Sequence, residues 1–148
     1  MFIRRPTTGD FNALYALGKN TPELRVSAIQ EFMDRDEFEM AIQNSSGVFL
    51  VAETNGEIGG FIYASGDDKD KPLQKKWACL VYLVVAPELR GQKIATQLYD
   101  ACVTSLKENG ITHLYGWAHT EGDGAILSFM QKNGFTAGHT YQWMDKEL

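Results

Sequence analysis

The sequence has few of the features that mark disulfide-stapled or membrane-spanning proteins. Its 148 residues include two cysteines, Cys79 and Cys102, and both stand among apolar neighbours, so we expect reduced core thiols. No apolar run approaches the roughly 20 residues of a membrane span, and no apolar signal-peptide stretch follows residues 1–5. These absences predict a cytoplasmic protein with no membrane partner.

Positive charge is also scarce. The 14 Lys and Arg residues are outnumbered by 19 Asp and Glu residues, which gives a formal net charge of -5. Nucleic-acid binding requires clustered basic residues that release counterions from phosphates, so we expect no nucleic-acid partner. The acidic balance favours a cationic partner, although solubility alone selects the same modest charge.

The composition is that of one globular domain. Hydrophobic residues make up 44% and charged residues 22% of the chain. A chain of this length buries about 70% of its unfolded surface, which is enough for a core without metal staples. We therefore expect a single domain over residues 1–148.

The hydropathy pattern predicts an α/β protein of the α+β type. The predicted fold has one mixed, mostly antiparallel sheet flanked by about four helices, and the elements follow the order βααβββαβαβ along the chain. The Asn55-Gly56 pair predicts a hairpin turn, and the almost unbroken apolar run 77–85 predicts a central strand. Strands are expected at residues 2–5, 48–52, 58–64, 77–85, 112–118 and 135–144 (one strand or a pair), and helices from about 11, over 27–44, from about 94, and over 125–132.

The most informative segment is residues 84–95, where a buried strand turns through a short polar loop into a helix. Unpartnered N–H groups at a helix start can cradle a phosphate or pyrophosphate, and the small residues Gly91 and Ala95 permit close approach. In the alternative interpretation Gly91 merely eases a turn, and Arg90 and Lys93 are solvated charges. The segment matches neither the P-loop nor the G-x-G-x-x-G pattern.

Residues 87–95, Pro-Glu-Leu-Arg-Gly-Gln-Lys-Ile-Ala, resemble the acetyl-CoA signature Q/R-x-x-G-x-G/A of the GNAT family of N-acetyltransferases. Arg90 and Ala95 match its two ends, whereas Lys93 stands where the family usually has glycine. Residues 123–135 resemble the family's pattern N-x-x-A-x-x-F-Y-x-x-x-G-F, with Asp123 in place of asparagine and Met130 in place of tyrosine. The order of elements also resembles the GNAT fold, so the resemblance spans nearly the entire chain.

This resemblance implies that acetyl-CoA is the acyl donor and that no metal is needed. The backbone of Leu83, Val84 and Val85 would bind the pantetheine arm like an added strand. Phe129 would wall the cleft, and Asp123 would lie beside the cofactor. The loop that would take the pyrophosphate consists of Arg90, Gly91, Gln92, Lys93, Ile94 and Ala95.

The catalytic groups that the family commonly uses are missing. Cys79 occupies the strand position that often carries a glutamate base, and a thiol is a poor base. Met130 stands where a tyrosine would protonate the leaving thiolate, and a thioether has no proton to donate. His119 is the candidate base, with Glu121 close behind it; in the alternative it is a loop histidine with local hydrogen bonds. Tyr82 is the candidate acid, with Tyr115, Tyr141, water or the new ammonium as alternatives. A backbone N–H near Val85 is the expected oxyanion donor.

The resemblance implies transfer of acetyl to a primary amine by direct attack in a ternary complex. The alternative is a GNAT-like sensor or scaffold module that binds acyl-CoA with little catalysis. The acceptor would be a small-molecule amine or a protein or peptide amine, and the chain a monomer or homodimer. A set of acidic residues indicates a cationic acceptor, and in the alternative these residues only form a solvated acidic surface. The residues are Glu31, Asp67, Asp68 and Asp70.

Overall fold

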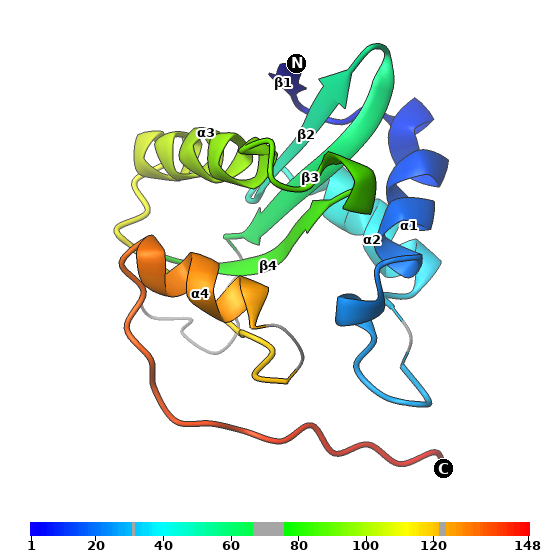
Figure 1. The fold of residues 1–148 in the computed structure, drawn as a ribbon, viewed down its shortest axis with the longest axis vertical. Helices are drawn as coiled ribbons and strands as arrows, with labels where there is room; N and C mark the ends of the chain where they lie inside the picture. Colours follow the sequence, from blue (N-terminus) through cyan, green and yellow to red (C-terminus); the bar gives the residue numbers. More distant parts are fainter. Residues whose placement is uncertain (31, 67–75, 122–123) are drawn as a thin grey trace.

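The computed structural model describes residues 1–30, 32–66, 76–121 and 124–148 (Figure 1). Its centre is a five-stranded sheet in the order β1-β2-β3-β4-β5. Neighbouring strands run antiparallel from β1 to β4, and β5 runs parallel to β4. The strands are β1 (Phe2–Arg4), β2 (Val48–Thr54), β3 (Glu57–Ser65), β4 (Trp77–Val85) and β5 (His113–Gly116).

Four α-helices in the described residues flank this sheet (Figure 1). Helices α1 (Phe11–Lys19) and α2 (Arg35–Gln43) cover one face, and α3 (Ile94–Glu108) covers the other. Helix α4 (Ala125–Lys132) follows β5. Single turns of 3-10 helix stand at Thr8–Asp10, Pro22–Leu24 and Pro87–Leu89. The predicted mixed sheet with four helices is thus confirmed.

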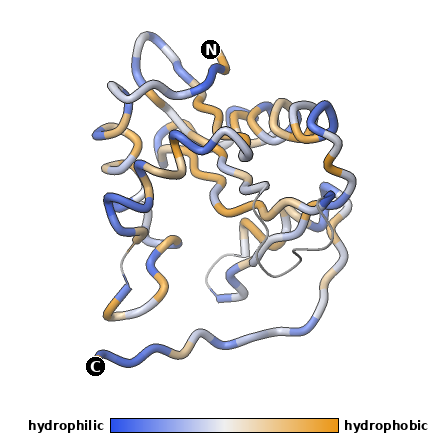
Figure 2. Tube along the Cα trace, turned by 180° about the vertical axis from the view of Figure 1, so that it is seen from behind, coloured by the Kyte–Doolittle hydropathy of each residue, from blue (hydrophilic) through white to orange (hydrophobic). Residues whose placement is uncertain are grey.

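Each face of the sheet has its own core, because side chains alternate between faces along a strand. On the α3 face, Leu98 and Cys102 pack against alternate residues of β2 such as Leu50. On the α1–α2 face, aromatic rings gather around Phe38, which is fully buried and lies 5.9 Å from the Phe61 ring centre. Figure 2 shows the apolar residues concentrated along the sheet and the inward sides of these helices.

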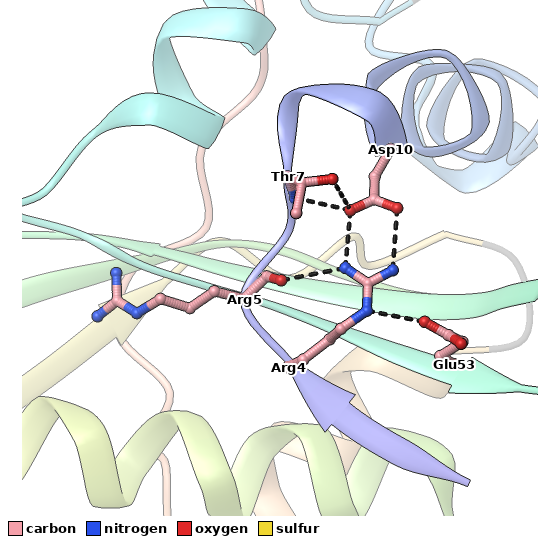
Figure 3. A network of polar contacts seen from close by, with 5 residues as sticks. All are labelled: Arg4, Arg5, Thr7, Asp10 and Glu53. Carbon is pink, nitrogen blue, oxygen red and sulfur yellow. Dashed lines mark hydrogen bonds and ion pairs between the residues drawn. The ribbon is translucent and has the colours of Figure 1, made fainter. Parts of the chain in front are cut away.

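A charged network ties β1 to its neighbours (Figure 3). Arg4 donates to both carboxylate oxygens of Asp10, at 2.7 and 2.9 Å, and its Nε donates to Glu53 at 2.7 Å. Asp10 also accepts from the Thr7 backbone N–H at the start of the first helical turn. The Arg4 guanidinium holds the pKa of Asp10 far below its ordinary value, so this carboxylate stabilises the fold in its ionised form.

The Asn55-Gly56 hairpin is confirmed, since both residues have positive φ, 55° and 82°, as a type I′ turn requires. The helix predicted over 27–44 forms only from Arg35, because the Asp34 side chain accepts a hydrogen bond from the Asp36 N–H and caps the helix there. The strand predicted over 112–118 is shorter, His113–Gly116.

The last strand, predicted over 135–144, is wrong. Residues 135–148 form neither helix nor strand in the structure, and the observed order ends at α4. The alternation of Tyr141 and Trp143 supplies a strand pattern, but a strand also needs a partner strand for its backbone hydrogen bonds, and this segment has none in the described chain. No helix among the described residues is long and apolar enough to cross a membrane.

Candidate functional site

The site begins where β4 and β5 separate. Their pairing ends at Leu80 and Gly116, whereas β4 continues to Val85. A Cβ atom on Gly116 would lie 3.0 Å from the Leu80 carbonyl oxygen and 3.2 Å from the Met130 side chain, so glycine permits the close approach of β5, β4 and α4. Beyond this point, no described strand pairs with the edge formed by residues 81–85.

A bulge in β4 sets the direction of the side chains along that edge. Tyr82 pairs with Tyr63 and Leu80 pairs with Ala64, which leaves Val81 as the extra residue. After the bulge, Leu83 packs toward the α3 core, and Tyr82 packs toward the aromatic core on the opposite face.

The separated strands open into a cleft of about 550 Å³. Its walls come from β4, from the loop and first turn of α3, from the segment after β5, and from the start of α4. The 3-10 turn Pro22–Leu24 borders it from the α1–α2 side. The predicted site residues that line it are Leu83, Val84, Val85, Arg90, Gly91, Lys93, Ile94, Ala95, His119 and Phe129.

The start of α3 presents a run of unpartnered backbone donors. The first helical hydrogen bond runs from the Gln97 N–H to the Lys93 carbonyl, and the backbone N–H groups of residues 91–96 donate to no atom of the described chain. Positive φ angles of 80° at Gly91 and 63° at Lys93 wind the loop in front of the helix. Six consecutive N–H groups and the positive end of the helix dipole make a site for an anion.

The conformation of Lys93 explains why glycine is usual at this position of the signature. A left-handed backbone costs an L-residue about 1–2 kcal/mol, and glycine pays no such penalty. The lysine retains the loop shape and adds an exposed positive charge at the cleft wall.

Arg90 connects the loop to the other side of the cleft. Its Nη1 donates to Oε1 of Glu23 at 3.0 Å, and its Nε donates to the Val85 carbonyl oxygen at 3.3 Å. Both partners of the ion pair are exposed, so its contribution to stability is small, about 0.2–1 kcal/mol. The pair nevertheless places a carboxylate, Glu23, at the cleft wall.

The predicted base lies in the cleft. The Nδ1 of His119 is 3.0 Å from the Glu121 carbonyl oxygen, which can only accept a hydrogen bond. This contact assigns the proton of the neutral ring to Nδ1 and leaves the Nε2 lone pair free. Both His119 and Glu121 line the cleft and are exposed.

The structure does not bring Tyr82 to the cleft. Its ring packs against Phe32, Phe38 and Phe61 with centroid distances of 5.4, 6.3 and 6.3 Å, and burial raises the pKa of its hydroxyl to about 12. Gln92 belongs to the loop, but it is exposed and is not among the residues that line the cleft. Asp123, like Glu31, Asp67, Asp68 and Asp70, lies outside the described residues.

The α4 wall is apolar. Phe129 packs edge-on against Tyr99 at 5.6 Å, and Met130 is buried beside Gly116. Sequence reasoning missed Thr21, Glu23 and Trp117, which also line the cleft, because nothing local in the sequence marks a residue that folding brings there. Within the described ranges, no three His, Cys, Asp or Glu side chains come together as a metal site.

Comparison with known proteins agrees with this geometry. A family model described as the acetyltransferase (GNAT) family matches residues 14–135. No curated protein sequence matches significantly.

Many solved structures share the fold, and three of them are described here. A transcriptional regulator from Bacillus halodurans C-125 has a TM-score of 0.76 at 19% identity, covering 98% of this chain and 99% of its own. The aminoglycoside N-acetyltransferase AAC(6')-Iy in complex with CoA has a TM-score of 0.73 at 18% identity, and the match covers 99% of this chain and 100% of that one. The PaiA N-acetyltransferase from Thermoplasma acidophilum in complex with coenzyme A has a TM-score of 0.72 at 21% identity, and the match covers 95% of this chain and 92% of that one.

Proposed function

Because the chain belongs to the acetyltransferase (GNAT) family, we propose that it transfers the acetyl group of acetyl-CoA to a primary amine by direct attack within a ternary complex. The observation that carries the proposal is the run of unpartnered N–H groups over residues 91–96, which opens into the cleft between β4 and β5. A pyrophosphate is the anion whose charge and oxygens suit such a run.

The donor would occupy the cleft along β4. The unpaired edge at Leu83, Val84 and Val85 offers backbone groups to the amides of the pantetheine arm, in the manner of an added strand. Phe129 supplies an apolar wall, and the positive charge of Lys93 adds attraction for the phosphates. A role for Asp123 beside the donor remains a prediction.

The transfer requires a neutral amine, since the lone pair of nitrogen must attack the thioester carbonyl. An alkyl ammonium has a pKa of about 10.4, so a base must remove its proton near neutral pH. The free Nε2 of His119 performs this step in our proposal. The C–N bond forms, a backbone N–H near Val85 stabilises the oxyanion, and the C–S bond then breaks. The thiolate takes its proton from the new ammonium or from water, because the Met130 thioether has none to give.

The acceptor side favours a cationic amine. Glu121 lines the cleft, and its carboxylate would attract an ammonium group, whereas the charge of Glu23 is balanced by Arg90. One structural neighbour is an aminoglycoside N-acetyltransferase, and an acceptor that carries several ammonium groups would suit this wall. Small-molecule amines and peptide amines are both acceptors to test.

The first test is a calorimetric titration with acetyl-CoA, CoA and ATP. Saturable binding of both CoA forms without binding of ATP supports the donor site, and no binding of either CoA form would end the acetyltransferase proposal. Thiol release would then be followed across a panel of aminoglycosides, polyamines and peptides. Turnover that depends on an amine completes the case.

The role of His119 is tested by substitution. His119→Ala is expected to lower turnover about 100-fold or more and to leave acetyl-CoA affinity nearly unchanged, because general-base catalysis contributes by that order. His139→Ala is the matched control, since His139 is exposed and does not line the cleft. Equal turnover of the two variants would remove His119 from the mechanism.

The second candidate function is a module that binds acyl-CoA with little catalysis. It is favoured by the positions of two residues: Cys79 on β4, in place of a carboxylate, and Met130 buried in the α4 wall, in place of a hydroxyl. Tight binding of acetyl-CoA without thiol release across the whole amine panel would support it over the enzyme.

A further inference from the structure

The cleft has a closed end that is made of apolar groups. The pairing of β4 with β5 ends at Leu80 and Gly116, so the cleft begins directly beyond this pair. Leu80 and Met130 both line the cleft, yet they keep only 6% and 5% of their surface exposed. The opposite end is the loop before α3, where Arg90, Gly91 and Lys93 are exposed. One end of the cleft is therefore open to solvent, and the other is closed by packed side chains.

Met130 fills the point at which the two strands separate. A Cβ atom on Gly116 would lie 3.2 Å from the Met130 Cε, so the methyl group of the thioether lies against Gly116. Met130 is buried, but it belongs to neither of the two cores that the described residues form on the faces of the sheet. The side chain therefore forms the end wall of the cleft rather than part of either core.

The donor proposed above would run the length of this cleft. Its pyrophosphate would bind at residues 91–96, and its pantetheine arm would follow β4 from Val85 toward Leu80. Five residues of strand span about 17 Å, which is the scale of an extended pantetheine arm. The acyl group is attached at the far end of that arm, so it would lie beside Met130. An acyl chain longer than acetyl meets a packed wall there instead of open space.

We propose that Met130 limits the length of the acyl group, so that the protein accepts acetyl-CoA and rejects butyryl-CoA and longer acyl donors. The inference rests on the proposed function, because it requires CoA to bind along β4. Additional methylene groups would have to displace buried atoms, and forcing carbon into a packed site is unfavourable. A single methylene changes the preference of an apolar pocket by about 10- to 200-fold. Met130 thus determines acyl specificity and takes no part in proton transfer.

The first test is the affinity of the unmodified chain for CoA, acetyl-CoA, butyryl-CoA and hexanoyl-CoA, measured by calorimetry. We expect acetyl-CoA to bind at least about 10-fold more tightly than butyryl-CoA, and hexanoyl-CoA to bind no better than butyryl-CoA. Binding requires no acceptor, so the result does not depend on which amine the protein uses. Equal affinities for the three acyl donors overturn the proposal.

Two substitutions shorten the side chain at the end wall. Met130→Ala is expected to raise the affinity for butyryl-CoA about 10-fold relative to acetyl-CoA, and to leave the affinity for CoA itself nearly unchanged. Met130→Val removes less packing and should shift the ratio in the same direction, which keeps the prediction testable if the alanine variant unfolds. Ile126→Ala is the matched control, because Ile126 lines the cleft one turn earlier in α4, about 6 Å along the helix axis. This control should not change the ratio of the two affinities.

Circular dichroism shows which variants are folded. An unchanged ratio in a folded Met130 variant that still binds CoA overturns the proposal and leaves the proposed acetyl transfer standing. A shift in Ile126→Ala as large as that in Met130→Ala overturns it in the same way, because the whole wall would then set the limit. A protein that binds none of the four CoA compounds overturns both this inference and the proposed function.

Discussion

Lys93 is held in a left-handed backbone conformation, φ 63° and ψ 15°, immediately before α3. That conformation costs an L-residue about 1–2 kcal/mol, whereas glycine adopts it freely. Glycine also adds about 0.4–1 kcal/mol of unfolded-state entropy that folding must overcome. Lys93→Gly is therefore expected to raise the free energy of unfolding by about 0.5–1 kcal/mol, or Tm by about 1–4 °C.

Two further variants separate backbone strain from charge. Lys93→Ala removes the ammonium and keeps the strain, so it should bind acetyl-CoA no better than Lys93→Gly while being less stable. Lys93→Val places a β-branched residue at positive φ and should destabilise by a further 1–2 kcal/mol or so. Urea denaturation gives the stabilities and calorimetry gives the affinities.

A control for this experiment lies outside the cleft. Asn55 also has positive φ, 55°, but asparagine tolerates this region, so Asn55→Gly should change stability by less than Lys93→Gly and should not change acetyl-CoA affinity. The reasoning is refuted if Lys93→Gly loses more than about 1 kcal/mol of stability, or if Lys93→Val matches the unmodified chain.

Two predictions concern the cores and the charged network. Phe38→Ala should lower the free energy of unfolding by about 3–5 kcal/mol, because removal of a fully buried ring leaves a cavity. Met40→Ala, on the exposed side of the same helix, should change the free energy of unfolding little. Urea denaturation measures both variants, and a cost near zero for Phe38→Ala would contradict the assigned core. Asp10 has a lowered folded-state pKa, so its contribution is complete above its unfolded pKa of about 4 and is lost as the pH falls toward the folded value. Asp10→Asn should therefore flatten the loss of stability below about pH 4, and an unchanged pH profile would show that the Arg4 contact does not operate in solution.

The sequence by itself determined the features that depend on near neighbours. The Asn55-Gly56 turn, the positions of α3 and α4 and the strand-loop-helix segment at residues 84–95 follow from residues adjacent in the chain. The start of α2 was predicted wrongly at residue 27, because the apolar pattern before Asp34 favoured a longer helix; the true start is marked by the capping residue Asp34 and the acidic residues in the first turn.

The tertiary structure decided which residues reach the cleft and which segments pair. The bulge at Val81 directs Tyr82 into the aromatic core, and only the pairing of β4 with β3 reveals it. The turn after α1 brings Glu23 to Arg90 across a sequence separation that no local pattern spans. Residues 140–144 have the composition of a strand but no partner in the described chain. Periodicity specifies which side chains share a face, whereas pairing depends on where the other edges of the sheet lie in space.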